Sequence, residues 1–205
     1  MKSIDPDELA PRDVYRLMIS AIVPRPIALV STLSAEGQPN LAPFSYFAGV
    51  SARPPLLSIS IGRGTSGDKD TLRNIRATHG FVVNIVNRDI AKQMVVTSGE
   101  YTSDVDEFRV AGLTPLASEV VMPARVKESP LHLECRAVDL FDAPGGAEVT
   151  LVIGRILRFH VSPAVFDREK GVVDPVGLNP VGRLGGDLYA TLSPPFSLAR
   201  PKIER

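Results

Sequence analysis

One glycine-rich segment gathers the groups that bind phosphate. Residues 62–67 read Gly-Arg-Gly-Thr-Ser-Gly, and a lysine and a threonine follow shortly after. Backbone amides of such a loop, the N-terminus of a following helix, cations and hydroxyls together hold a phosphate dianion. The side chains concerned are Arg63, Thr65, Ser66, Lys69 and Thr71. The alternative is an ordinary loop in which Asp68 or Asp70 caps the helix and the basic side chains are solvated, and both interpretations stay open.

The same segment matches two nucleotide-binding patterns only in part. Gly62, Gly64 and Gly67 fit a G-x-G-x-x-G spacing after a predicted strand. However, the chain begins with a predicted hairpin rather than a β-α-β unit, and Asp68 stands where the helix would meet a pyrophosphate. A Walker A loop fails because Asp68 separates Gly67 from Lys69, and no Ser or Thr follows the lysine directly. The sequence therefore favours a general phosphate site over a dinucleotide loop.

A β-hairpin with small hydroxyls is predicted for residues 24–47. Apolar runs at 27–33 and 40–47 flank a turn at 35–38. An antiparallel pair places side chains and backbone amides beside one another, so the hydroxyls in its arms suit a flat polar ligand. These hydroxyls belong to Ser31, Thr32 and Ser45.

The elements that must position these residues are mostly strands. Beyond the hairpin, the patterns predict helices at 11–20, 69–79 and 88–97, a loop at 49–55, and strands at 56–61, 81–86, 130–141 and 148–161. Gly80 is the expected C-terminal cap of the second helix. Only the stretch 56–86 resembles a β-α-β unit. The sequence therefore predicts a mainly β (α+β) fold, a small antiparallel barrel with flanking helices, rather than a doubly wound parallel sheet.

Length, composition and charge exclude several classes. The chain has 205 residues and 23 basic against 23 acidic side chains. We expect one domain over 1–205, with a core at about 18–162 and an irregular, wrapping tail at 171–205. Zero net charge gives no general attraction to nucleic acid or membrane. Cys135, the single cysteine, excludes an intrachain disulfide, and no apolar segment resembles a signal core or a membrane span, so we expect a cytoplasmic protein.

The histidines give no metal or hydrolase signature. Three separated histidines lack Cys or Glu at ligand spacing, and no G-x-S-x-G elbow is present. His79 precedes the expected helix cap and is interpreted as structural. His132 is expected to point outward from its strand. His160 ends a strand, where a ligand pocket can open.

Several segments together resemble the flavin reductase-like, FMN-binding split-barrel family, in the branch that includes flavoredoxin-type proteins. They are RPIALVST, NLAPFSYF, PPLLSISI, KDTLRNI, FVVNIV and GRLGGDLY, within residues 18–189. The resemblance implies a six-stranded antiparallel split barrel, a homodimer and non-covalent FMN near the dimer interface. It also implies NADH or NADPH as electron donor, with reduced flavin serving an acceptor or a partner monooxygenase. A small redox protein is the other possible partner, as a reductant of the flavin.

The resemblance also assigns residues. It implies that the flavin ring and ribityl chain lie along Ser31, Thr32, Ser45, Tyr46 and Phe47. It also implies that the phosphate is bound by the segment containing Ser60, Arg63, Lys69, Asp70 and Thr71. Thr97 and Ser98 are weaker candidates, and His160 and the segment 183–189 are candidates for approach from the partner subunit. Hydride passes directly between the nicotinamide and flavin rings, so we expect no catalytic acid or base.

Three functions follow from these observations. The first is an NAD(P)H-dependent FMN reductase or the reductase component of a two-component oxygenase. The second is a protein that carries or stores flavin for electron transfer without NAD(P)H activity of its own. The third is a module that binds another phosphorylated ligand, such as a pyridoxal phosphate or haem relative of the split barrel. Reduction of bound flavin by NAD(P)H separates the first two, and failure to bind FMN favours the third.

Overall fold

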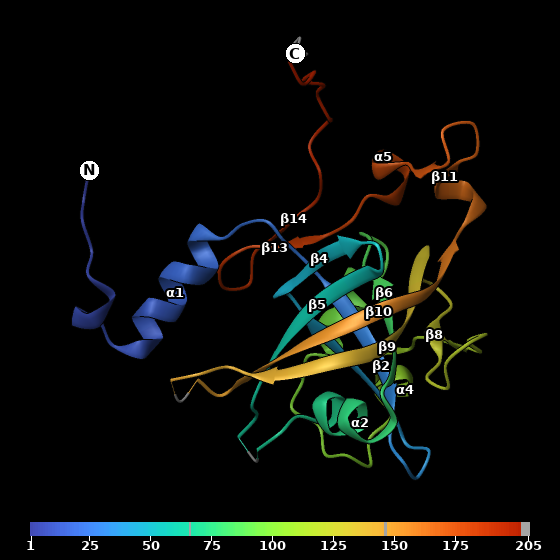
Figure 1. The fold of residues 1–205 in the computed structure, drawn as a ribbon, viewed down its shortest axis with the longest axis horizontal. Coiled ribbons are helices and arrows are strands. Elements are labelled where there is room, and N and C mark those ends of the chain that lie inside the picture. The colour runs from blue at the N-terminus through green and yellow to red at the C-terminus, as the bar shows by residue number, and fades with distance from the viewer. Residues whose placement is uncertain (66, 146, 202–205) are drawn as a thin grey trace.

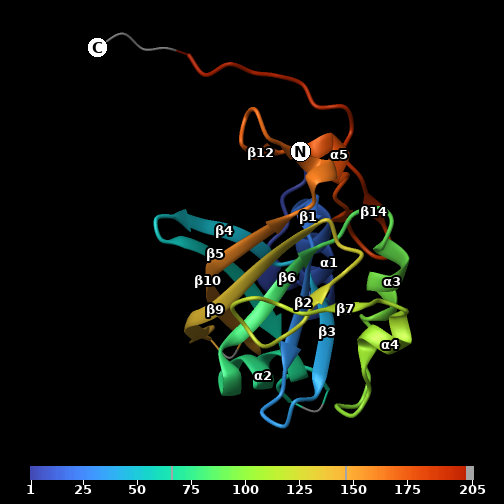
Figure 2. The same ribbon diagram turned by 90° about the vertical axis from the view of Figure 1, so that its right-hand side faces the viewer.

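The computed structural model describes residues 1–65, 67–145 and 147–201. Seven strands of the described residues form one sheet, in the order β3-β2-β6-β9-β10-β5-β4 (Figures 1 and 2). Their bounds are β2 Ala28–Leu33, β3 Pro39–Phe44, β4 Phe47–Ala52, β5 Pro55–Gly62, β6 Gly80–Ile85, β9 Leu131–Asp142 and β10 Val149–Val161. The long β9–β10 hairpin confirms the two long β runs expected near residues 130 and 160, although Gly146 in the turn lies outside the described residues.

Helices and short strand pairs surround this sheet. The helices are α1 Pro11–Ala21, α2 Asp70–Thr78, α3 Ala91–Val96, α4 Glu107–Ala111 and α5 Pro175–Leu178, with 3₁₀ turns at Pro6–Glu8 and Pro163–Val165. The short strands are β1 Arg25–Pro26, β7 Pro115–Leu116, β8 Arg125–Val126, β11 Phe166–Asp167, β12 Val172–Val173, β13 Gly182–Arg183 and β14 Tyr189–Ala190. Figure 2 shows the β4–β5 hairpin projecting on one side and α3 with α4 on the opposite flank.

The pairing confirms a mainly β antiparallel fold and excludes the dinucleotide-binding one. Every strand pair is antiparallel, and β5 and β6, which flank α2, are not neighbours in the sheet. The sheet has one strand more than the six expected, because residues 47–52 form β4 and so take up part of the loop expected at 49–55. β4 pairs with β5 from Phe47 opposite Ile59 to Ala52 opposite Pro55. After Phe47 the residues of β4 are exposed and mostly small, so the strand lacks the buried alternation by which strands are detected.

Strand β2 divides the interior into two apolar clusters. Ala28 and Val30 belong to a first cluster that also contains Leu72 and Ile75 of α2. Leu29 belongs to a second cluster, to which α3 and α4 contribute. Because β2 lies between β3 and β6 and both of its faces are covered, its side chains are buried in either direction.

The end of α2 differs from the expectation. His79, rather than Gly80, takes the left-handed backbone conformation, with φ of 59°, and its N–H donates to the carbonyl oxygen of Ile75. Gly80 instead begins β6. The structural interpretation of His79 is therefore confirmed, while the predicted cap position moves by one residue.

Helix α1 lies outside the barrel (Figure 1). None of its residues is buried, and apolar side chains in and just after it are exposed: Tyr15, Leu17, Met18, Ile22 and Val23. An apolar helix face needs a covering surface to be stable in water. No helix of the described residues has the length and apolar character required to cross a bilayer.

Candidate functional site

The corner between β3 and β4 is open and polar. Ser45 and Tyr46 connect the two strands, and Tyr46 is 37% exposed. The backbone N–H of Ser60 on β5 donates to the Tyr46 carbonyl oxygen at 2.9 Å. Ser45 and Phe47 are half-buried. Four of the residues expected at the site, Ser45, Tyr46, Phe47 and Ser60, are therefore brought together.

The N-terminus of α2 lies beside this corner. Lys69 occupies the N-cap position and makes no side-chain cap, so neither Asp68 nor Asp70 plays the capping role considered from the sequence. Lys69 is exposed, and its ammonium nitrogen lies 5.9 Å from the centre of the Phe44 ring. Within the described ranges, no carboxylate forms an ion pair with Lys69. The corner thus has a free cation and an uncapped helix end next to it.

The neighbouring arginines are already paired with carboxylates. Arg63 Nε lies 3.5 Å from Asp68, and Arg76 Nε lies 3.4 Å from the same carboxylate. Asp70 forms an ion pair with Arg73 one helical turn away. Arg63 and Asp70 therefore form a rim of ion pairs around Lys69. Ser66, expected in the same cradle, lies outside the described residues.

Three hydroxyls expected at the site are buried instead. Ser31, Thr32 and Thr71 are 0%, 1% and 1% exposed. The Ser31 hydroxyl donates to the carbonyl oxygen of Ala124. The amide nitrogen of Asn40 donates to Thr32 Oγ1 at 3.1 Å and to Thr71 Oγ1 at 2.9 Å.

The structure therefore does not bring these three side chains to the open corner. Ser31 and Thr32 lie on β2, which is covered on both faces, and Thr71 lies on the inner face of α2. The weaker candidates Thr97 and Ser98 likewise donate to carbonyl oxygens of their own helix, those of Met94 and Val95. All these hydroxyls satisfy groups of the chain itself.

Comparison with known proteins decides the family. Residues 19–175 match the flavin reductase like domain. The chain belongs to the flavin reductase-like family. The resemblance found in the sequence is thereby confirmed, together with its fold, the FMN-binding split barrel, and flavoredoxins are among the solved structures of the same fold.

Two solved structures and one sequence relative are similar over nearly their whole length. Nitrilotriacetate monooxygenase component B from Bacillus cereus is 36% identical with a TM-score of 0.91, covering 97% of this chain and 98% of that one. The 2-nitrobenzoate 2-nitroreductase NbaA from Pseudomonas fluorescens is 31% identical with a TM-score of 0.88, covering 98% and 96%. The uncharacterised protein YwrF of Bacillus subtilis (strain 168) is 38% identical, covering 95% of this chain and 97% of its own.

The described residues fit the parts of a flavin mononucleotide. A phosphate dianion requires a cation and free N–H donors, and Lys69 with the uncapped end of α2 supplies both. An uncharged ring requires a surface with polar groups, and the corner presents the half-buried Ser45 and the exposed Tyr46. Among the described residues no group of His, Cys, Asp and Glu is arranged to hold a metal ion.

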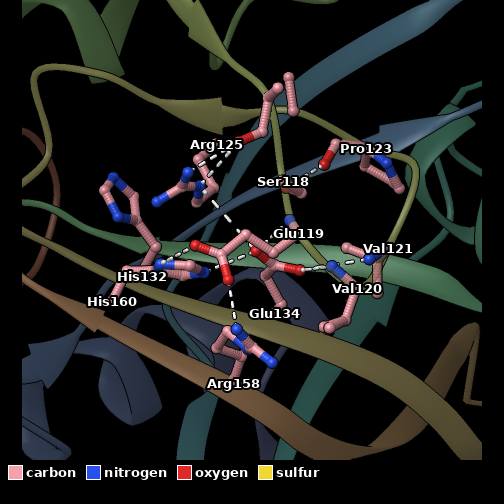
Figure 3. Close-up of polar contacts among 12 residues, drawn as sticks. Ser118, Glu119, Val120, Val121, Pro123, Arg125, His132, Glu134, Arg158 and His160 are labelled. Atoms are coloured by element: carbon pink, nitrogen blue, oxygen red, sulfur yellow. Dashed lines mark hydrogen bonds and ion pairs between the residues drawn. The ribbon is translucent and has the colours of Figure 1, made fainter.

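His160 belongs to a separate cluster around Glu134 of β9 (Figure 3). Glu134 is 0% exposed and accepts the N–H groups of Glu119 and Val120 at 2.8 and 2.7 Å, and His160 Nε2 lies 2.6 Å from it. Burial raises the pKa of the Glu134 carboxyl, but the two N–H donors and His160 outweigh burial and lower the pKa. The cluster holds the segment 118–121 against β9. The prediction of a pocket at His160 is therefore not supported.

The expectation for His132 is wrong. Its side chain does not point into solvent: it is 6% exposed, and Nε2 lies 2.8 Å from the carbonyl oxygen of Val126. Burial lowers the pKa of the His132 ring. The reason is that Val126 of β8, six residues earlier in the chain, lies against this face, and the alternation within β9 alone does not reveal it.

Two surface hollows are lined mostly by residues outside the corner between β3 and β4, although Asp70 of the rim lines the first. One, of about 590 Å³, is lined by Ser34, Gln38, Asp70, Arg73, Asp104 and Glu107, among others. The other, of about 470 Å³, is lined by residues 164–167, 170 and 172–175. Neither is lined by Ser45, Tyr46, Ser60 or Lys69.

The sequence patterns did not indicate that Arg25 belongs to the corner. This side chain is 4% exposed and donates to Ser45 of the corner. A charged residue just before a long apolar strand was the available signal, since arginine is rarely buried without a specific partner.

Proposed function

We propose that this chain is an FMN reductase that takes hydride from NADH or NADPH and delivers reduced flavin or electrons to an acceptor or a partner oxygenase. The observation that carries the proposal is the position of Lys69. Its unpaired cation stands at the uncapped end of α2 and beside the open corner at Ser45 and Tyr46. A cation for the phosphate and a polar corner for the ring therefore lie side by side, as a phosphorylated flavin requires.

Each described residue has a limited task in this proposal. Lys69 and the first turn of α2 hold the phosphate, with Arg63 and Asp70 at the rim and Ser60 between phosphate and ring. Ser45, Tyr46 and Phe47 orient the ring. Bound flavin would itself supply the hydride chemistry, so the protein needs no catalytic acid or base.

The proposal includes a homodimer. The corner is open on one side, and α1 presents an apolar face that the rest of its own chain leaves exposed. A second copy that covers both would enclose the flavin and bury the helix face. A single domain over 1–205 and a cytoplasmic location complete the proposal, since reduced nicotinamides are cytoplasmic electron donors.

The similarity to an oxygenase component supports a partner. The similar Bacillus cereus protein is named component B of a monooxygenase. By analogy, the acceptor of this chain's reduced flavin is an oxygenase that is a separate protein.

A second function, direct reduction of a nitroaromatic compound, is favoured by one comparison. The similar Pseudomonas fluorescens protein is named a 2-nitrobenzoate 2-nitroreductase. The same flavin corner would serve both reactions, with the open side receiving the aromatic acceptor instead of releasing reduced flavin.

Anaerobic reduction tests the proposal. The purified protein is given FMN, excess is removed, and the flavin absorbance is followed after NADH or NADPH is added without oxygen. Turnover with excess free FMN is measured in parallel, so that loosely held flavin is also detected. Rapid bleaching or turnover with either donor is expected. Bound flavin that stays oxidised overturns the reductase and favours the flavin-carrier alternative, and absence of both binding and turnover favours another ligand. Addition of 2-nitrobenzoate to the reduced protein tests the second function.

A further inference from the structure

Arg25 joins three separate parts of the chain. Its guanidinium donates to the carbonyl oxygens of Ile19 and Ile22 at the end of α1, at 2.6 and 2.7 Å. It also donates to the Leu184 carbonyl oxygen at 2.8 Å, and its Nε donates to Ser45 Oγ at 3.4 Å. One buried side chain therefore connects the N-terminal helix and the C-terminal turn to the flavin corner.

The charge of Arg25 is only partly compensated. No ion pair involving Arg25 is found in the part of the chain that the structure describes. The carbonyl end of α1 offsets part of the charge, since a helix terminus is equivalent to about half an elementary charge. Burial reduces screening by water, and an arginine stays protonated throughout the range in which proteins fold. A net positive charge therefore remains beneath the corner, with the guanidinium carbon 6.0 Å from the centre of the Tyr46 ring.

We propose that Arg25 is a positioning residue for bound flavin that fixes Ser45 and whose charge favours the reduced over the oxidised ring. The inference rests on the proposed function, because it requires flavin at the corner. The oxidised ring is neutral, whereas the reduced ring is an anion near neutral pH. A nearby buried cation lowers the free energy of the anion and leaves that of the neutral ring nearly unchanged. Arg25 thus raises the reduction potential of the bound flavin.

Two substitutions separate the charge from the contact. Arg25→Met removes both the charge and the hydrogen bonds. Arg25→Lys keeps the charge but cannot reproduce the fork of donors that reaches Ser45. The control is Arg125→Met, because Arg125 of β8 is also largely buried and donates to a carbonyl oxygen, that of Ala117, without touching the corner.

The test compares binding and reduction potential in folded protein. Dissociation constants for oxidised FMN come from fluorescence titration, midpoint potentials from anaerobic spectroelectrochemical titration, and folding from circular dichroism. We expect Arg25→Met to make the midpoint potential of the bound flavin more negative. The affinity for reduced FMN should fall on the order of tenfold more than the affinity for oxidised FMN. Arg25→Lys should leave the midpoint potential unchanged and lower the affinity for oxidised FMN as much as Ser45→Ala does. The double variant should bind oxidised FMN no more weakly than either single variant.

The outcomes are distinct. An unchanged midpoint in folded Arg25→Met, or an equal shift in Arg125→Met, overturns the proposal. If Arg25→Met does not fold, the cycle of Arg25→Lys with Ser45→Ala decides, and full additivity overturns the positioning role. Failure of the unmutated protein to bind FMN is a failure of the proposed function itself, recognisable because no variant is involved.

Discussion

The Lys69 ammonium lies over the Phe44 ring, 5.9 Å from its centre. This contact joins two segments that the sequence separates, the strand β3 and the loop before α2. The phosphate-binding groups and the wall for the ring thereby meet at one place.

Replacing Lys69 by alanine should weaken the binding of FMN but not that of riboflavin, which lacks the phosphate. A hydrogen bond to a charged group contributes about 1.5–3 kcal/mol, which is roughly a tenfold to hundredfold loss in affinity. Fluorescence titration with both flavins measures the effect. Lys170→Ala is the control, because Lys170 pairs with Asp167 in a separate hairpin. Equal losses for FMN and riboflavin would contradict a phosphate contact.

Replacing Thr32 by valine should lower stability while leaving flavin affinity within about twofold of its original value. The substitution keeps the shape and removes the oxygen that accepts from the amides of Asn40 and Asn74. Leaving such buried donors unpaired costs about 1–3 kcal/mol. Urea unfolding measures the loss, and Thr191→Val in the exposed tail is the control. A large affinity loss with unchanged stability would show that the hydroxyl contacts the ligand after all.

Replacing Gly154 by alanine should destabilise the barrel. A Cβ at this position of β10 would collide with Cζ of Phe81, a ring that is fully buried. Overpacking of this kind costs about 1–3 kcal/mol. Phe81→Leu should reduce the cost, so a double-mutant cycle by thermal or urea unfolding should show favourable coupling. Gly49→Ala, which meets nothing within 4 Å, is the control, and equal losses at the two glycines would refute the steric explanation.

The sequence predicted the fold where local patterns decide it. The β9–β10 hairpin follows from two long β runs around a turn, and α2 follows from helical spacing of Leu72 and Ile75. Strand β4 was missed because its residues are small and mostly exposed, so that pairing with β5 alone makes them a strand.

The candidate site was predictable in part, for a related reason. Lys69 and the corner at Ser45 carry their chemistry in their residue types. The burial of Thr32 depends on the neighbours of β2 in the sheet, β3 and β6, and β6 is distant in sequence. The role of Arg25 depends on Leu184, 159 residues away. Local sequence patterns do not encode such contacts.

Replacing Glu107 by glutamine should stabilise the protein at neutral pH. Glu107 is 7% exposed, and its carboxylate accepts the N–H of Leu41 at 3.1 Å. Burial raises the pKa of this carboxyl, and the charges of Asp70 and Asp106 raise it further. The N–H of Leu41 lowers the pKa but does not cancel burial. Ionised Glu107 is therefore less favourable in the folded chain than in the unfolded one.

The sign of the pH dependence follows from this raised pKa. The contribution of Glu107 to stability is fully present below the unfolded pKa, about 4.3, and is lost as the pH rises through the higher folded value. Glutamine carries no charge and keeps an oxygen for Leu41. Urea unfolding at several pH values should show Glu107→Gln more stable than the parent at pH 7, with the difference shrinking toward pH 4. Glu169→Gln on the surface should show no such trend. A Glu107→Gln protein less stable at pH 7 would mean that the carboxylate's contacts outweigh its burial.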